Sequence, residues 1–461
     1  MYRICLQAKR GEAGIEPNGE LTRDSLPFLR RAIVGAGARS LTVRVAGLFL
    51  SYAANVLLSR LLGAEQYGEY SIALSWALTI ALPAKAGFDN SALRYSTIYL
   101  ENRDHAALRG FIRLASTSIF LASACIAGLI LAVGSSFISL PRQSLLWSAL
   151  LVFPLALLAF YSVLLRTTGR VAAGQFYEQI LRPGLIIIGA SAFVVAGSGF
   201  NALLAIQLTT VAAFGALLAS GLNLRLVLRS AVLQKPDYGR WREWLTVSMP
   251  MLLVGVVQET TNQIDILLLG QLADNEQAAL FAASWRIASL VPFALIALSM
   301  LGAPLVASAY ARRSFDELHH VSKLVARMGF VASILAALTL MGLGGWLLSW
   351  FGPAFTKGTP VLYVLLMGGV INAFTGIVSY FMTMTGRERH ALVIYIVALS
   401  LSILFNLLLI PRYGAVGAAV ASTVATASWN IAMLIYVRRT IGIDASAVAL
   451  TPVRRLTVMR P

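Results

Sequence analysis

Residues 144–165 read SLLWSALLVFPLALLAFYSVLL and hold no charged side chain. A run of about 20 mostly apolar residues is long enough to cross the hydrocarbon core of a bilayer as one helix. Comparable runs precede and follow this one, which gives twelve expected membrane spans. They lie near residues 40–62, 69–89, 112–134, 144–165, 178–197, 202–223, 244–269, 286–310, 325–350, 360–384, 390–410 and 414–437. The sequence therefore predicts an all-α integral membrane protein.

The composition of the whole chain agrees with this fold class. Of its 461 residues, 58% are hydrophobic and only 12% are charged, whereas about 25% are charged in a typical soluble domain. A soluble protein of this size cannot bury so much apolar surface, and disordered chains have the opposite composition. The cysteines, Cys5 and Cys125, are far apart, and the four histidines are scattered. We therefore expect no disulfide framework, zinc site or metal enzyme.

The distribution of positive charge predicts the orientation of the chain. Lysine and arginine number 37 against 20 aspartates and glutamates, which gives a net charge of +17. Most basic residues fall in alternate loops and in the two terminal segments, as is typical of the cytoplasmic side of a membrane protein. We therefore expect both termini to be cytoplasmic. Because topology accounts for the excess charge, we expect no nucleic acid as a partner.

Short motifs recur at equivalent positions in the two halves of the chain. LSW at 74–76 matches ASW at 283–285, and TGR at 168–170 matches TGR at 385–387. We therefore expect an internal repeat of two six-helix lobes, whose interface is the usual substrate site of a transporter. The expected divisions are an N-terminal tail at 1–37, an N-lobe at 38–228, a linker at 229–243, a C-lobe at 244–439 and a C-terminal tail at 440–461.

Four segments, taken in order, resemble a known family. They are LSRLLGAEQYGEY at 58–70, AGFDNSALRY at 86–95, QIDILLLG at 263–270 with FAASWR at 281–286, and NLLLIPRYGAVGAAVA at 406–421. Together they resemble the Wzx-type oligosaccharide flippases of the multidrug/oligosaccharidyl-lipid/polysaccharide (MOP) superfamily. The resemblance covers the chain from about residue 38 to residue 439. It implies two six-helix lobes in a V around a central cavity that alternates between the two faces of the membrane.

The resemblance also implies a function. The expected cargo is an oligosaccharide repeat unit linked through pyrophosphate to a polyprenol, moved from the cytoplasmic to the periplasmic leaflet of the bacterial inner membrane. Such a flippase serves O-antigen, capsule or exopolysaccharide synthesis beside a polymerase and a chain-length regulator. Because no covalent chemistry is needed, we expect neither an enzyme nor a cofactor, and a coupling ion would be H⁺ or Na⁺. Lipid II flippases tend to carry an arginine midway along span one, and SYAAN at 51–55 lacks it.

Span seven contains the most unusual stretch for a membrane helix, QETTNQID at 258–265. At 100° per residue, Glu259, Asn262 and Gln263 share one face of the helix. Such residues line a polar cavity, in which Glu259 or Asp265 would bind a cation or a proton, or they form a buried polar interface between lobes. For Asp265 we favour the structural interpretation, in which it pairs with Arg286.

Two arginines lie deep within expected spans, Arg182 and Arg286. The planar fork of an arginine suits the oxygens of a pyrophosphate. The alternative for each is a structural ion pair, formed by Arg286 with Asp265 and by Arg182 with Glu178, four residues earlier.

Two further pairs of charged residues stand at the ends of the first two spans. Lys85 and Asp89 are spaced i, i+4 on span two, which predicts either an intrahelical ion pair or part of a gate or cavity. Arg39 and Arg44 stand at the cytoplasmic end of span one. They would receive the pyrophosphate or act as ordinary positively charged anchors.

Two other classes of function remain as alternatives. A cation-coupled drug antiporter of the same superfamily would have the same fold, but it typically carries an acidic site in the first lobe. The acidic residues of the first-half spans, Asp89 and Glu178, both lie near cytoplasmic ends. A membrane polysaccharide polymerase or ligase would need a large periplasmic loop, and every expected loop is short.

Overall fold

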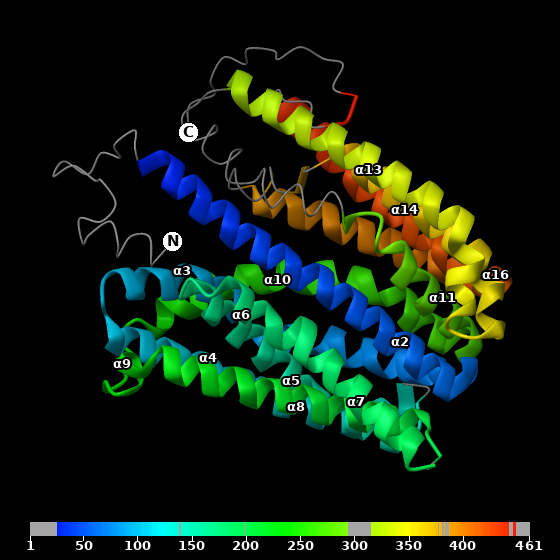
Figure 1. Ribbon diagram of the computed structural model, residues 1–461, viewed down its shortest axis with the longest axis horizontal. Helices are drawn as coiled ribbons and strands as arrows, with labels where there is room; N and C mark the ends of the chain where they lie inside the picture. The colour runs from blue at the N-terminus through cyan, green and yellow to red at the C-terminus, as the bar shows by residue number, and fades with distance from the viewer. Residues whose placement is uncertain are drawn as a thin grey trace. The chain divides into compact units, whose positions relative to one another are not determined.

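The computed structural model of the protein describes residues 25–137, 140–197, 199–293, 315–376, 378–379, 382, 387–441 and 446–448. All regular secondary structure in these residues is helical (Figure 1). The helices of the first half are α2 (Ser25–Lys85), α3 (Phe88–Glu101), α4 (His105–Phe137), α5 (Arg142–Thr167), α6 (Val171–Phe176), the π-helix η1 (Tyr177–Leu181), α7 (Arg182–Val195), α8 (Ala202–Val227) and α9 (Arg229–Val232). Those of the second half are α10 (Trp241–Leu272), α11 (Asn275–Ala288), α13 (Phe315–Ser349), the 3₁₀ helix η2 (Pro353–Gly358), α14 (Thr359–Thr375) and α16 (Glu388–Ile441).

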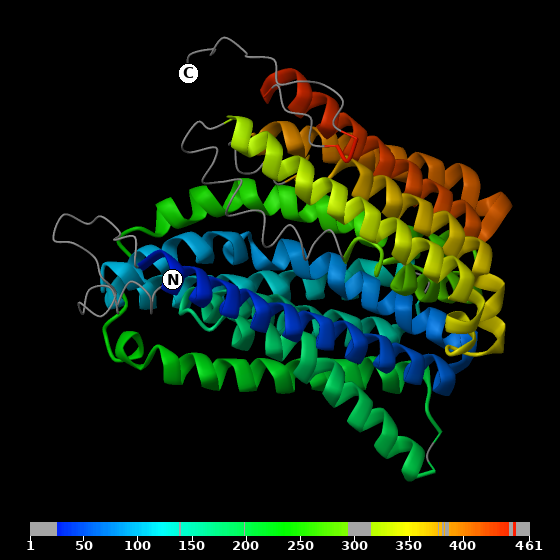
Figure 2. The same cartoon turned by 45° about the horizontal axis from the view of Figure 1, so that its top comes forward.

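The two longest helical runs, α2 and α16, are each two helices joined at a glycine. Gly63 in α2 has φ of +70° and ψ of 176°, and Gly414 in α16 has φ of +54° and ψ of −131°. Neither conformation is helical, and glycine adopts positive φ without the steric cost that other residues incur. The chain turns back within α2 (Figure 2). Across this turn, the hydroxyl of Tyr67 donates a hydrogen bond to Oδ1 of Asn55.

Eight helical segments among the described residues are long and apolar enough to cross a membrane. Two of them, Arg39–Lys85 and Arg389–Thr440, contain two expected spans each, divided by the glycines above. α10 is not one of the eight, because its polar stretch makes it less apolar, so the span expected near 244–269 stays a prediction. The span expected near 286–310 lies mostly outside the described residues. The predicted fold class, an all-α protein with multiple spans, is confirmed.

The chain separates into two compact units. The first comprises Met1–Ala54 and Ala77–Gly255, and the second comprises Asn55–Trp76 and Val256–Pro461. The turn around Gly63 therefore belongs with the second half of the chain, and the first part of α10 belongs with the first half. These units are not the same divisions as the expected lobes, whose boundaries stay a prediction.

In the first unit, α5 is the central helix. It packs against α3, α4, α6 and α8, and most of its side chains are buried. The first part of α10 is fixed to this unit by Trp244, which is fully buried and whose Nε1 donates a hydrogen bond of 2.7 Å to the hydroxyl of Tyr99. Phe111 packs edge-on against the same indole ring. These contacts join α10 to α3 and α4 within the unit.

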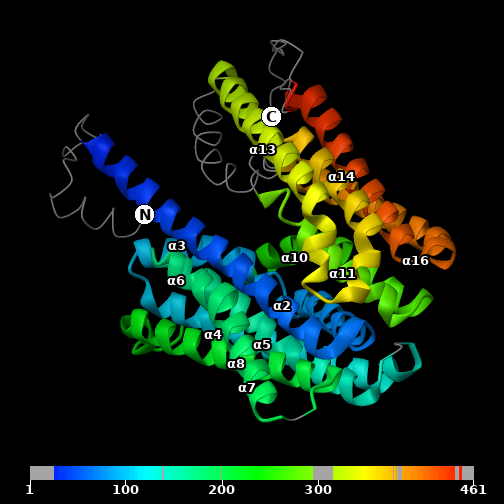
Figure 3. The ribbon, with the colours of Figure 1, turned by 45° about the vertical axis from the view of Figure 1, so that its right-hand side comes forward.

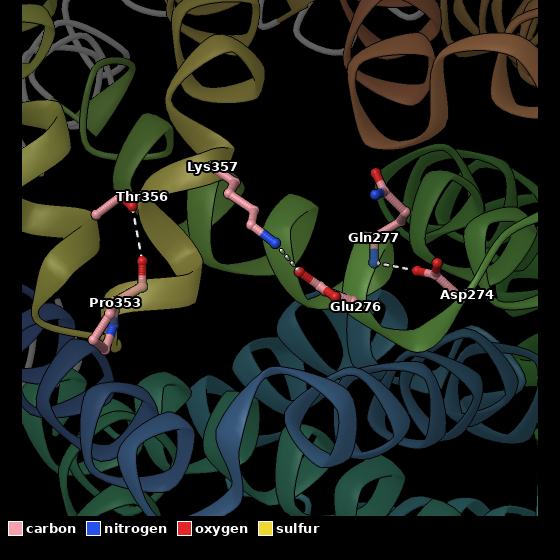
Figure 4. A network of polar contacts seen from close by, with 6 residues as sticks. All are labelled: Asp274, Glu276, Gln277, Pro353, Thr356 and Lys357. Carbon is pink, nitrogen blue, oxygen red and sulfur yellow. Dashed lines mark hydrogen bonds and ion pairs between the residues drawn. The ribbon is translucent and has the colours of Figure 1, made fainter.

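In the second unit, α14 packs against α11, α13 and α16 (Figure 3). The N-terminus of α11 is capped by Asp274, whose carboxylate accepts the backbone N–H of Gln277 at 2.8 Å (Figure 4). The side-chain oxygen of Gln277 in turn accepts the backbone N–H of Ala415, next to the turn at Gly414. Nearby, Lys357 of η2 pairs with Glu276 at 3.1 Å. These polar contacts join three segments of the unit at one end.

Candidate functional site

A buried carboxylate lies in the second unit at the end of the polar stretch of α10. Asp265 is 1% exposed. Its Oδ1 accepts a hydrogen bond of 2.7 Å from Nδ2 of Asn406 and a longer one of 3.5 Å from Oγ of Ser402. The side chain of Ser422 also hydrogen-bonds this carboxylate. Asp265 is therefore held by neutral groups from both parts of α16.

The expected pair between Asp265 and Arg286 does not form. Arg286 instead donates a hydrogen bond from Nε to the hydroxyl of Tyr67, at 3.2 Å. No ion pair joins a basic residue to Asp265 within the described parts of the chain. Oδ1 of Asn406 is buried there too and has no hydrogen-bond partner among the described groups. The site thus combines an uncompensated carboxylate with an unused oxygen acceptor.

The rest of the polar stretch is less buried. Nε2 of Gln263 donates to Oε1 of Glu259 at 3.2 Å, as expected for two residues on one face of the helix. Glu259 is half-buried and Asn262 is exposed, whereas Gln263 is 8% exposed. Gln258 donates from Nε2 to the hydroxyl of Tyr395 at 3.0 Å. Whether these residues line a cavity stays a prediction.

A cluster of charged side chains lies in the first unit, centred on Arg166 at the end of α5. Arg166 is half-buried and interacts electrostatically with Glu178, Arg44 and Asp89. Asp89 also pairs with Lys85, at 3.9 Å between Oδ2 and Nζ. We call these five residues the cation cluster, because its three basic residues outnumber its two acidic ones.

The pair between Lys85 and Asp89 forms, but not within one helix as expected. α2 ends at Lys85 and α3 begins at Phe88. Between them, Ala86 and Gly87 have φ of +49° and +72°. Proline at position 83 lies in the last turn of α2 and favours this break, because it cannot continue the regular backbone hydrogen bonds. The ion pair therefore spans a break between two helices.

Arg182 does not form the ion pair with Glu178 that the sequence predicted. Both residues are described, and no ion pair joins them. Glu178 lies within a π-helical turn, Tyr177–Leu181, and the backbone N–H of Arg182 bonds to the carbonyl of Tyr177, five residues back. Such turns occur frequently at functional sites. Arg182 is half-buried at the start of α7, and Arg39 is exposed on α2.

Four of the residues described above were not singled out from the sequence. Arg166 stands at the end of an apolar span, where arginine is a common anchor, so nothing marked it. Ser402 and Asn406 are polar residues within the apolar span expected at 390–410, and Ser422 lies in the next span. Polar residues inside a span deserve the scrutiny given to charged ones, and this signal was available for Asn406.

Comparisons with known proteins identify similar sequences. A sequence model of the family described as "Polysaccharide biosynthesis protein" matches residues 37–301, and a model described as MatE matches residues 250–408. "Probable flippase AglR" of Haloferax volcanii is 25% identical over 268 residues, which are 56% of this chain and 53% of the relative. The chain thus spans about half the length of the relative that it matches.

Solved structures with the same fold belong to transporters. The lipid II flippase MurJ, in an inward closed conformation, has a TM-score of 0.68 at 15% identity. The alignment covers 88% of this chain and 87% of the MurJ chain. An inward-facing multidrug resistance MATE family transporter of the MOP superfamily has a TM-score of 0.66 at 14% identity, with coverage of 88% and 98%. A MOP superfamily transporter from Pyrococcus furiosus has a TM-score of 0.65 at 18% identity, with coverage of 89% and 96%. These likenesses concern the fold.

Proposed function

The chain belongs to the polysaccharide biosynthesis protein family, and we propose that it is a flippase for a polyprenyl-pyrophosphate-linked oligosaccharide. The cargo moves from the cytoplasmic to the periplasmic leaflet of a bacterial inner membrane, in which both termini of the protein are cytoplasmic. It supplies repeat units for a surface polysaccharide such as O-antigen, capsule or exopolysaccharide. A polymerase and a chain-length regulator act on the same pathway.

The cation cluster is the observation that carries this proposal. A pyrophosphate with several sugars cannot cross hydrocarbon without a polar, cationic path, because unpaired charges cost several kcal/mol or more each. Arg44, Arg166 and Lys85 supply three positive charges against the two of Asp89 and Glu178. Arginine forks bind phosphate oxygens by two parallel hydrogen bonds. An anionic cargo therefore balances the excess charge of this cluster while it passes.

The site at Asp265 binds the coupling ion, H⁺ or Na⁺. The oxygens available to ligate a cation belong to the carboxylate of Asp265, the amide of Asn406 and the hydroxyls of two serines, Ser402 and Ser422. Hard cations prefer such oxygen ligands. The single negative charge of this carboxylate balances one monovalent cation. Among the described residues, no group of three or more His, Cys, Asp and Glu side chains could hold a metal ion. An isolated charge in the membrane interior is costly, so binding of the ion stabilises the site.

Moving the cargo across the bilayer requires no covalent bond to form or break. The protein therefore acts as a transporter and not as an enzyme. A drug or small-molecule antiporter of the same superfamily is the second candidate. The match of the MatE family to 250–408 favours it, because this range includes the buried Asp265. The two candidates differ in cargo and share the need for a coupling ion.

The test uses a deletion strain of the source organism. We expect polyprenyl-pyrophosphate-linked oligosaccharides to accumulate with their glycans on the cytoplasmic side, and the intact gene to reverse the accumulation. Arg166→Gln should fail to reverse it at equal protein level, whereas Arg170→Gln should succeed. Arg170 is exposed and lies four residues away, so it controls for loss of one positive charge. A normal lipid pool with altered drug sensitivity would overturn the flippase proposal in favour of the antiporter.

A further inference from the structure

A groove of about 530 Å³ lies in the first unit between α4, α5 and α8. No residue of the cation cluster lines it. Its walls are mostly apolar and include Phe153 and Leu157 of α5 and Phe214, Leu218 and Leu222 of α8. Leu218 and Leu222 are 67% and 61% exposed. Because α8 is long and apolar enough to span a membrane, these side chains open the groove to lipid and not to water.

One end of the groove is strongly basic. Arg109 and Arg113 from the start of α4 and Arg225 from the end of α8 line it. Arg113 and Arg225 are exposed, and Arg109 is half-buried and donates a hydrogen bond to the backbone carbonyl of Gln234. No ion pair is formed by these three arginines with any described residue. Three positive charges thus converge at one end of an apolar groove without an anionic partner from the described chain.

The length of the groove matches one leaflet of a bilayer. Along α8 it runs from Phe214 to Arg225, which at about 1.5 Å per residue is roughly 16 Å. The hydrocarbon core of a bilayer is about 30 Å thick, so one leaflet contributes about half of that. The arginines therefore lie at the depth of lipid headgroups when Phe214 lies near the middle of the bilayer. By the charge distribution of the sequence, this is the cytoplasmic leaflet.

We propose that this groove binds a phospholipid with an anionic headgroup from the leaflet on the arginine side. Its phosphate lies among Arg109, Arg113 and Arg225, and one acyl chain follows the apolar wall from Leu222 toward Phe214. Basic pockets between membrane helices on the cytoplasmic side bind anionic headgroups in this way. The groove ends within one leaflet, which suits an acyl chain rather than the longer chain of a polyprenol. The site is therefore distinct from the proposed path of the cargo.

The charge of the site is tested by native mass spectrometry of the purified protein in detergent. Phosphatidylglycerol and phosphatidylcholine with identical acyl chains are added, and bound lipid is counted. The wild type should retain phosphatidylglycerol in preference, and the double variant R113Q/R225Q should weaken that retention by about tenfold, since each arginine near a membrane surface contributes several-fold. Arg240→Gln, an exposed arginine that does not line the groove, should change nothing.

The apolar part of the site is tested separately. Leu218→Trp narrows the groove without changing charge and should reduce the retention of phosphatidylglycerol. Leu226→Trp should not, because Leu226 is 77% exposed on the same helix and does not line the groove. Inorganic phosphate should not displace the lipid. Thermal unfolding of each variant checks that it is folded.

Three outcomes would overturn the proposal. They are equal retention of the two phospholipids by the wild type, unchanged retention by the folded R113Q/R225Q protein, and displacement of phosphatidylglycerol by polyprenyl phosphate at equal concentration. The last result would assign the groove to the carrier lipid. None of these measurements depends on flippase activity, so they test the lipid site independently of the proposed function.

Discussion

Oδ1 of Asp265 on α10 accepts a hydrogen bond of 2.7 Å from Nδ2 of Asn406 on α16, 141 residues later in the chain. Both side chains are buried. Nδ2 of Asn406 also bonds to the carbonyl of Ser402, at 2.9 Å, so the amide is oriented with its nitrogen toward the carboxylate. Its oxygen is then left without a described partner. A bound cation in contact with both oxygens would satisfy the whole group.

Asp265→Asn should abolish the response of the protein to the proposed coupling ion. A ligand that binds only the folded state raises its stability in proportion to the logarithm of ligand concentration. We therefore expect the Tm of the wild type to rise when NaCl replaces choline chloride at constant ionic strength, or when pH falls if the ion is H⁺. The variant should show neither rise. In the absence of Na⁺ its Tm should equal or exceed that of the wild type, because it removes a buried uncompensated charge.

Glu276→Gln is the matched control for Asp265→Asn. Glu276 belongs to the same unit and also bears one carboxylate, but its ion pair with Lys357 is largely exposed. Glu276→Gln should keep the full rise of Tm with the ion, since an exposed ion pair contributes only about 0–1 kcal/mol to stability. An unaltered response of Asp265→Asn would show that the ion binds elsewhere.

The sequence was sufficient to predict an all-α fold with multiple membrane spans, because a span depends on a local property, about 20 apolar residues in a row. It was insufficient for the partners of its charged residues, which depend on how helices pack. Asp265 was expected to pair with Arg286, an arginine in the same half of the chain. The contact with Asn406 depends on the rotation of α16 against α10, which neither segment encodes by itself.

Local deviations from α-helical geometry were also not predicted. Pro183 has no N–H to donate, and the turn before it is π-helical, which changes the spacing between Glu178 and Arg182. The break at Ala86 and Gly87 likewise separates Lys85 from Asp89. Rules for i, i+4 pairs assume regular helix. They predicted the wrong geometry where the helix is interrupted, and those interruptions lie at or beside the cation cluster.

Tyr67→Phe should destabilise the second unit. Its hydroxyl accepts the Nε hydrogen of Arg286 and donates to Asn55, and the tyrosine is fully buried. Loss of the hydroxyl leaves both polar groups without this partner, at a cost of about 1–3 kcal/mol. The measurement is a double-mutant cycle on thermal unfolding with Arg286→Met. If the hydrogen bond matters, the effects of the two changes should be less than additive, and strict additivity would contradict it.

The stability of the protein should fall at high pH in part through Tyr95. Burial, with the hydrogen bond to Glu243 and the charge of that carboxylate as further causes, raises the pKa of Tyr95 to about 12 from its usual value of 10.0. The opposing charge of Arg94 lowers this pKa, and Tyr99 raises it. Between these values the folded protein holds a proton that the unfolded chain releases, so stability decreases as pH rises. Below about pH 10 the contribution is complete and constant.

Tyr95→Phe isolates this contribution. All other tyrosines are present in both proteins, so the difference in Tm between wild type and variant at each pH reports on Tyr95. The Tm of the wild type should fall more steeply than that of the variant between about pH 10 and 12. Parallel curves over that range would show that the proton on Tyr95 does not contribute to stability.

Gly87→Ala should be among the most damaging conservative changes in the first unit. Gly87 has φ of +72°, and an added Cβ would lie 2.1 Å from the backbone carbonyl oxygen of Ser248. Gly197, in the same unit, is the matched control, with φ of +65° and no atom within 4 Å of an added Cβ. Gly197→Ala should therefore show only the conformational cost, about 1–2 kcal/mol. Gly87→Ala adds overpacking of about 1–3 kcal/mol, and it displaces α10 or the break beside the Lys85–Asp89 pair. Transport should fall with it at equal protein level, whereas equal losses of Tm in the two variants would show that the contact with Ser248 is not tight.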